Sequence, residues 1–358
     1  MGNIVYGDIS PRTAAFVVKD LLKRGFPYLV LEKFGQARPI PTRNSKTIKF
    51  RRYYLAMNSG TWSPYAYFQT DSQSNFSPTV KTLSEGVTPA ATSIEKTDYE
   101  ATLIQVGDRT VITDVVMDTH EDDILKESIE ILGEQAAIIL EKIRFNVVKA
   151  GTNVVYADAG SGDDDTRAEV ETVFTAAVQR SVTRTLKRQL AKHITSTVKS
   201  TPAYGTESIQ PAFIGICHPD LEYDISQAAQ FTPVEKYSQV TPFEGEIGKI
   251  GDVRYICTTI FEPWLGAGGS SGTNVLETSS AADIYPILYL ARDAYGLCPL
   301  KGKDSITPMV VNPKPSDSDP MAQRGHVSWK AMTTAIILND SWMVRAEVAC
   351  TDSSNLVD

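Results

Sequence analysis

Apolar positions recur at steps of three and four residues between residues 119 and 150, which is the longest helical pattern in the chain. Thr119 is a candidate N-cap, acidic residues at 121–123 suit the positive end of the helix dipole, and Gly151 is a stop signal. At a rise of 1.5 Å per residue, the pattern predicts a rigid helix roughly 45–50 Å long. Its apolar stripe consists of Leu125, Ile129, Leu132, Ala136, Ile139, Ile143 and Val147.

Shorter periodic segments and β-rich runs predict further elements on both sides of this helix. Residues 11–25 carry an amphipathic helical pattern, and residues 175–194 carry another, with Thr175 as the expected N-cap. Alternating strands are expected between 306 and 350. Other runs rich in β-branched or aromatic residues predict strands at 46–55, 100–117, 212–217, 253–259 and 285–291.

The stretch at 56–99 is dense in Ser, Thr, Pro, Asn and Gln, yet it also carries large aromatic residues. An unstructured linker of that length is unusual inside a compact domain, so a projecting hairpin is the better interpretation. A two-stranded hairpin is marginal in water, and its aromatic side chains therefore need cover from a neighbouring molecule. These aromatic residues are Trp62, Tyr65, Tyr67, Phe68 and Phe76.

Composition places the 358-residue chain among ordinary globular proteins, with 42% hydrophobic and 22% charged residues. A net charge of −8 argues against a broad basic face that grips phosphate backbones. No apolar run approaches the roughly 20 residues of a membrane helix, and the N-terminus lacks a signal-peptide pattern. The cysteines lack metal-ligand spacing and are expected to be buried free thiols: Cys217, Cys257, Cys298 and Cys350.

Candidate catalytic and ligand-binding patterns all have a simpler structural interpretation. The His-Pro-Asp turn at 218–220 is expected to place Asp220 as the cap of a helix from Leu221 to Ala229. The glycine-rich loop at 266–272 lacks the Lys-Ser/Thr of a phosphate-binding loop, and the acidic run at 163–165 lacks the spacing of a calcium loop. No Gly-x-Ser-x-Gly elbow occurs. We therefore expect no catalytic residues, no cofactor and no metal.

Several motifs occur in one collinear order. Near the start are FGQARPIP at 34–41 and KTIKFRRY at 46–53, and near the end are RGHVSWKA at 324–331 and ILNDSWMVR at 337–345. Between them lie further matching motifs at 83–89, 132–136, 150–154, 186–188, 218–220, 245–248, 291–296 and 319–324. This series resembles the major capsid proteins of tailed double-stranded-DNA phages, built on the Hong Kong 97-type shell fold. The chain departs from that pattern by polar insertions near 57–79 and 262–280.

The resemblance implies an α+β capsid fold with an N-arm, an extended β-hairpin loop, a peripheral domain with a long spine helix, and an axial domain. The corresponding segments are an arm at 1–45, an extended loop at 46–117, the spine helix at 118–151, the axial domain at 152–290, and peripheral-domain strands at 291–358.

The function implied by the resemblance is self-assembly into the hexamers and pentamers of an icosahedral phage head. Expected partners are other copies of the chain, a scaffolding protein or domain, a portal, a decoration protein, and packaged double-stranded DNA held without sequence specificity. The expected location is the virion shell, assembled in the host bacterial cytoplasm. The alternatives are a tail-tube subunit, which the long helix disfavours, and a hydrolase in the segment 152–290, for which no nucleophile–base set is found.

Three sets of residues are expected to carry this function. The arm at 26–45 is proline-stiffened and loses little entropy on docking, so we expect it to lie along a neighbouring subunit and not in a core. The spine-helix core is expected to consist of Leu125, Ile129, Leu132, Ala136, Ile139 and Ile143. Contacts between subunits are expected at Arg38, Arg43, Trp62, Tyr65, Tyr67, Phe68, Phe76 and Glu85.

Overall fold

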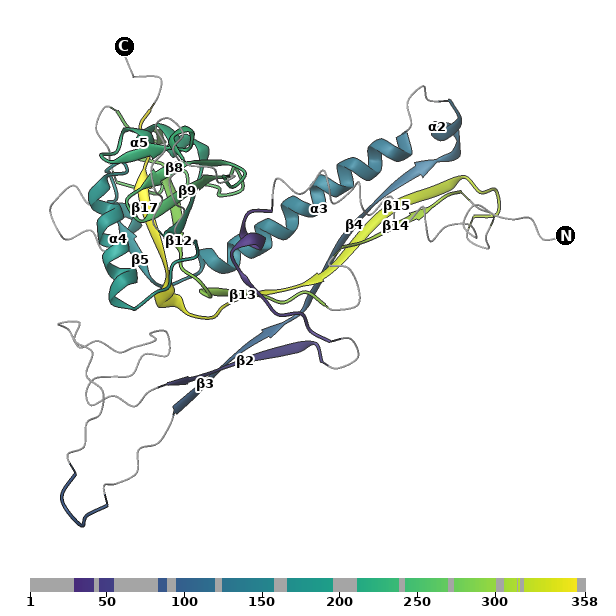
Figure 1. Ribbon diagram of the computed structural model, residues 1–358. Coiled ribbons are helices and arrows are strands. Elements are labelled where there is room, and N and C mark those ends of the chain that lie inside the picture. Colours follow the sequence, from purple (N-terminus) through teal and green to yellow (C-terminus); the bar gives the residue numbers. More distant parts are fainter. Residues whose placement is uncertain are drawn as a thin grey trace.

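The molecule is elongated, with a globular unit at one end, a long helix and sheet extending from it, and a projecting hairpin (Figure 1). The computed structural model describes residues 29–41, 45–54, 83–88, 95–119, 124–157, 166–195, 211–237, 242–269, 274–300, 306–313, 315 and 319–352. The predicted helix at 11–25, the acidic run at 163–165 and most of the stretch at 56–94 lie outside the described residues.

The long helix α3 (Ile124–Lys149) packs on a three-stranded antiparallel sheet of β14 (Ile306–Val311), β15 (Arg324–Thr333) and β4 (Ile104–Thr113). Buried and less buried side chains alternate along β15, as the period of two along a strand requires. The sheet and the first half of α3 share one apolar core: Ile112, Ile129, Leu132, Ala136, Leu140, Ile306, Val327, Trp329 and Ala331.

The predicted start of this helix is wrong. Thr119 is not an N-cap but the last residue of a separate short helix, α2 (Asp114–Thr119), and α3 begins at Ile124. The strand predicted to continue to residue 117 ends at Thr113, because its ladder partner is Arg324, the first residue of β15. Without a partner strand the β-branched run turns into helix, and the carboxylate of Asp114 accepts the N–H of Val115 at 2.8 Å.

The buried face of α3 rotates along its length. The prediction is confirmed for Ile129, Leu132 and Ala136, whereas Leu125, Ile139 and Ile143 are only partly buried. The second half of the helix leaves the three-stranded sheet and packs on the globular unit, so a different set of positions is covered. That set is Glu141, Arg144, Phe145 and Val148.

A seven-stranded sheet forms the middle of the globular unit, in the order β5-β17-β12-β6-β9-β8-β7. Its faces follow the alternation of side chains: Phe213 and Cys217 face α4 and α5, whereas Ile214 and Ile216 face the end of α3. The elements are β5 (Val154–Tyr156), β17 (Met343–Ala349), β12 (Ile284–Leu290), β6 (Phe213–Cys217), β9 (Val253–Cys257), β8 (Glu246–Ile250), β7 (Phe231–Pro233), α4 (Ala176–Arg188) and α5 (Glu222–Gln227).

Three expectations for this unit need correction. β17 lies inside the seven-stranded sheet, so the assignment of residues 291–358 to peripheral strands is wrong for this strand. α4 is capped by Thr175 as predicted but ends at Arg188, because Leu190 adopts a positive φ of 52°. The 3-10 turn after β6 is capped by His218, whose ring nitrogen accepts the N–H of Asp220 at 3.3 Å, and the helix α5 begins at Glu222 without a side-chain cap from Asp220.

Small elements connect these parts. A three-stranded sheet in the order β1-β13-β16 joins the arm to the tail, and β2 pairs with β3 as an antiparallel hairpin. The bounds are β1 (Gln36–Ala37), β13 (Tyr295–Leu297), β16 (Ala335–Ile337), β2 (Thr47–Tyr54), β3 (Glu95–Thr102), β10 (Glu277–Thr278) and β11 (Ala281–Ala282). The 3-10 turns are Leu31–Lys33, Arg167–Glu169, Pro219–Leu221, Val234–Lys236 and Asp340–Trp342.

Candidate assembly surfaces

The arm is fastened to its own subunit by a buried carboxylate. Glu141 of α3 is fully buried, and its Oε1 accepts the backbone N–H groups of Val30 and Leu31 at 2.9 and 2.5 Å. The Tyr295 hydroxyl donates to the backbone oxygen of Leu31. Donors and acceptors of this arm segment are therefore satisfied by side chains from two other elements, as burial of backbone polar groups requires.

Charged and aromatic contacts extend this anchor. Arg144 lies beside Glu141 at 3.5 Å and reaches Glu32 at 3.1 Å. Burial raises the pKa of Glu141, and the hydrogen bonds from Leu31 and the nearby Arg144 guanidinium oppose that rise. Phe34 packs edge-on against Phe243 of the globular unit, with 5.2 Å between ring centroids. Residues 29–34 thus connect the long helix to the globular unit.

The arm then continues as a strand of its own subunit. β1 pairs in parallel with β13, and the N–H of Arg38 and of Ile40 donate to Leu297 and Pro299 at 2.8 and 2.9 Å. Leu31, Phe34 and Ile40 are all buried. The expectation that the arm is separate from any core is therefore wrong for residues 29–40. Arg38 is exposed, which leaves it available for other contacts, and Arg43 lies outside the described residues.

The β2–β3 hairpin has one charged face. Lys49 pairs with Glu100, and Arg51 forms a bidentate ion pair with Asp98 at 2.8 and 3.0 Å. The Arg51 guanidinium holds the pKa of the Asp98 carboxyl below its usual value. Cross-strand pairs of opposite charge fix register, although exposed pairs stabilise little.

The other face of the hairpin meets its own subunit at the root and again at Arg52, whose guanidinium lies over the Trp342 ring at 5.6 Å from its centroid. A small core at the root contains Ile40, Leu103 and Cys298, with Ile48 and Phe50 packed against it. Tyr53 belongs to the charged face, since it is two positions beyond Arg51 on the same strand, and it has an exposed fraction of 61%. The hairpin projects from the rest of the molecule (Figure 1), and its charged face is exposed.

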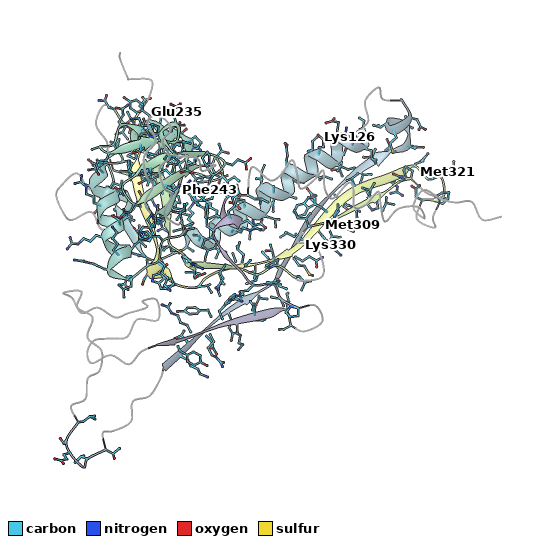
Figure 2. All side chains as sticks on the ribbon, in the orientation of Figure 1. Lys126, Glu235, Phe243, Met309, Met321 and Lys330 are labelled. Atoms are coloured by element: carbon cyan, nitrogen blue, oxygen red, sulfur yellow. The ribbon has the colours of Figure 1, made fainter. Side chains whose placement is uncertain are left out.

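The three-stranded sheet has a second face that α3 does not cover. β15 pairs with both neighbours, which places Val111, His326 and Val311 in one row and Arg109, Ser328 and Met309 in another. Val111, Val311 and Met309 are exposed by 52, 42 and 37%. Figure 2 shows Met309 and Lys330 on this sheet, and Lys126 on the helix. Apolar side chains rimmed by polar ones mark this face as a candidate contact surface.

The remaining predicted contact residues are placed as follows. Glu85 is exposed in a turn closed by the N–H of Val87 and the oxygen of Ser84 at 3.1 Å. Its neighbours Leu83 and Val87 are also exposed, by 75 and 66%. The predicted aromatic contacts lie outside the described residues: Trp62, Tyr65, Tyr67, Phe68 and Phe76.

The weak catalytic and ligand patterns resolve into structural contacts. Asp220 accepts the Tyr285 hydroxyl at 2.8 Å and lies 3.0 Å from the His218 ring, which ties the turn to β12. Gly268 and Gly269 donate their N–H groups to Ala282 and Val170 at 2.9 and 3.0 Å, so these groups are not free to bind phosphate.

Neither a metal-ligand cluster nor a membrane-spanning helix is found among the described residues. Across the described part of the chain, no group of three or more metal-ligating side chains is assembled. No helix among the described residues has the length and apolar character needed to cross a bilayer.

Sequence reasoning missed two groups of buried contacts. Glu141 and Arg144 are charged residues within an amphipathic helix, and their spacing gives no sign that they are buried. Cys217 and Cys257 meet with 3.4 Å between their sulfurs, although 40 positions separate them. In each case the partner comes from a distant part of the chain, so local pattern carries no signal.

Comparisons with known proteins agree with this architecture. The chain resembles the capsid of Ralstonia phage GP4, with a TM-score of 0.58, 11% identity, and coverage of 89% of this chain and 88% of that one. It resembles the cyanophage Pam1 capsid at a TM-score of 0.56, 11% identity, and coverage of 92 and 93%. The capsid of cyanophage P-SCSP1u gives 0.56, 10%, and coverage of 90 and 88%. These likenesses confirm the expected capsid fold.

Sequence comparison identifies the family. Curated protein sequences give no match. The profile of the family described as phage capsid protein matches residues 96–344, from the second hairpin strand to the start of β17. That range is more than half of the chain and includes α3, β13 to β16 and every strand of the seven-stranded sheet except most of β17. The chain therefore belongs to the phage capsid protein family, and it is a major capsid protein, a structural component of the phage head.

Proposed function

We propose that copies of this chain assemble into hexamers and pentamers that close an icosahedral head around packaged double-stranded DNA. The observation that carries the proposal is the β2–β3 hairpin, a two-stranded sheet that meets its own subunit with one face and exposes the other, the charged face with Tyr53. A two-stranded hairpin needs a third layer for stability, and a neighbouring subunit supplies it.

The shape of the subunit supports assembly through several contacts. The hairpin, the uncovered face of the three-stranded sheet and the globular unit point in different directions (Figure 1). Contacts around a closed ring are heterologous, so different surfaces of each copy must meet. Individually weak contacts then add, because each new contact of a partly bound subunit is intramolecular. The exposed apolar side chains of β4 and β14 fit this role.

The proposed partners follow from the same role. Assembly takes place in the host cytoplasm, with a scaffolding protein or domain, a portal, and a decoration protein on the finished shell. The net charge of −8 supports a DNA-facing surface that confines the polymer without holding it, because phosphate backbones are repelled by an acidic surface.

The test shortens the hairpin and leaves its described strands in place. Because Tyr54 pairs with Glu95, residues 55–94 are replaced by Asn-Gly, a two-residue turn suited to a tight hairpin. We expect the shortened protein to keep the far-ultraviolet circular dichroism of the full chain and to form no shells under negative-stain electron microscopy. The full chain is expected to form spherical shells. Shells of normal appearance from the shortened protein would overturn the proposal, and tubes from the full chain would favour a tail-tube subunit.

A further inference from the structure

Two cysteines lie side by side at the ends of adjacent strands. Cys217 is the last residue of β6 and Cys257 the last residue of β9, and the two are register partners in this parallel pair. Their sulfur atoms are 3.4 Å apart. Register partners on neighbouring strands project their side chains from the same face of the sheet, which explains the contact.

The two thiols differ in accessibility. Cys217 is fully buried, whereas Cys257 is partly exposed. The hydrogen bond with Cys257 and burial together raise the pKa of the Cys217 thiol well above its ordinary value. Cys257 is therefore the thiol that a dissolved reagent reaches first, and Cys217 is the thiol that follows.

The backbone geometry suits a disulfide. Neighbouring strands lie about 4.8 Å apart, and disulfides join Cα atoms separated by roughly 4.4–6.8 Å. A bond length of about 2.05 Å requires the sulfurs to close the present gap of 3.4 Å. We expect rotation of the two side chains toward each other to close this gap. The other cysteines differ: Cys350 donates to the backbone oxygen of Asp220 at 3.3 Å, and Cys298 lies in the apolar core at the hairpin root.

We propose that Cys217 and Cys257 form a reversible disulfide within the subunit when the protein meets a low-molecular-weight disulfide such as oxidised glutathione. The Cys257 thiol loses its proton to water, and the thiolate attacks one glutathione sulfur, which releases one glutathione thiolate that takes up a proton. The Cys217 thiol then loses its proton, and its sulfur attacks the Cys257 sulfur and releases the second glutathione. Two cysteines are oxidised, one disulfide reagent is reduced to two thiols, and the reverse exchange reopens the bond.

The bond would cross-link the middle of the seven-stranded sheet. β6 and β9 are neighbours in its centre, and the closed loop contains α5, β7 and β8. In a reducing cytoplasm the pair stays as thiols, and an oxidising medium closes it. A cross-link of this kind restricts the unfolded chain and so favours the folded one. The inference does not depend on the proposed mode of assembly.

The experiment treats the purified full chain with oxidised glutathione, blocks remaining thiols in denaturant, and digests with trypsin. Each cysteine falls in its own tryptic peptide, with Cys217 in 200–236 and Cys257 in 255–292. We expect two of the four thiols to disappear, a mass loss of about 2 Da for the two hydrogens, and a cross-linked pair of these two peptides. Oxidation should also raise the denaturant midpoint of unfolding, and a reducing agent should restore it.

Matched variants separate the outcomes. Cys257→Ser is expected to lose both the cross-link and the shift in midpoint, whereas Cys298→Ser is expected to keep both. Three results would overturn the proposal. They are a cross-link between subunits in place of the internal one, a stable glutathione adduct on Cys257 with no closure, and a closed bond that leaves the midpoint unchanged.

Discussion

Glu141 of the long helix α3 accepts the backbone N–H of Leu31 at 2.5 Å, so a buried carboxylate holds the arm to α3. The same oxygen accepts the N–H of Val30, and the other oxygen faces Arg144. Removal of this carboxylate takes away the hydrogen-bond acceptor of two backbone N–H groups and one anionic partner of the buried Arg144 guanidinium. We therefore expect Glu141→Ala to lower the free energy of unfolding by about 3–5 kcal/mol.

Two further variants test this anchor. Glu141→Gln keeps an oxygen acceptor for the two N–H groups, so it should lose less stability than the alanine variant. Asn146→Ala, on the exposed side of the same helix, should change stability by less than about 0.5 kcal/mol. Denaturant unfolding of purified subunits measures all three. Equal midpoints for Glu141→Ala and Asn146→Ala would contradict the anchor.

Glu141 also makes stability depend on pH. Its folded-state pKa is raised above the ordinary value of 4.5 by burial. As pH rises past that value the unfolded chain loses its proton first, so the folded state binds more protons and stability falls. The decline ends once the pH exceeds the folded-state pKa. The free-energy difference between the native chain and Glu141→Gln, followed from pH 4 upward, should show this decline, and an increase over the same window would contradict it.

Two truncations distinguish the anchored arm from the residues before it. Removal of residues 1–28 should leave the anchor and its stability in place. Removal of residues 1–40 should destabilise the subunit, because Leu31, Phe34 and Ile40 are buried in its cores. Each fully buried apolar side chain contributes roughly 1.5–3 kcal/mol. Thermal unfolding of both truncated subunits measures the difference, and equal melting temperatures would show that residues 29–40 add nothing.

Adjacent positions on α3 offer a matched pair of substitutions. Leu132 is 4% exposed and faces the three-stranded sheet, whereas Ile131 is 58% exposed. Leu132→Asp buries an unpaired carboxylate, which costs several kcal/mol, and should prevent folding. Ile131→Asp should leave the subunit folded. Soluble expression and circular dichroism measure both, and a folded Leu132→Asp subunit would contradict the assigned core.

The hydrophobic pattern of a segment predicts a helix or a strand correctly where residues close in sequence determine which side chains are buried. The helical stripe finds Ile129, Leu132 and Ala136, and the hydrophobic run of β6 correctly predicts a fully buried strand. Thr119 was misplaced because the end of β4 is set by where β15 begins, which is more than 200 residues away. Such distant pairings have no local signature.

Of the candidate assembly surfaces, some can be predicted from local sequence and others cannot. The hairpin could be expected from its polar, aromatic-rich sequence between two β-branched runs. The arm's attachment could not, because it depends on Glu141 and Tyr295, which lie in other elements and whose sequence neighbours give no sign of their role. The cysteine pair is hidden for the same reason, since only the parallel pairing of β6 with β9 brings the two thiols together.

The place of β17 has a consequence for synthesis on the ribosome. This strand pairs with β12 over seven residues and with β5 over three, yet it is the last strand of the sheet to be translated. Until it emerges, β12 and β5 each lack a neighbour, and the sheet that presents the globular unit stays incomplete. Domains fold during translation as their residues appear. A nascent subunit therefore cannot complete this sheet until residues 343–349 have emerged, although β5 was translated almost 190 residues earlier.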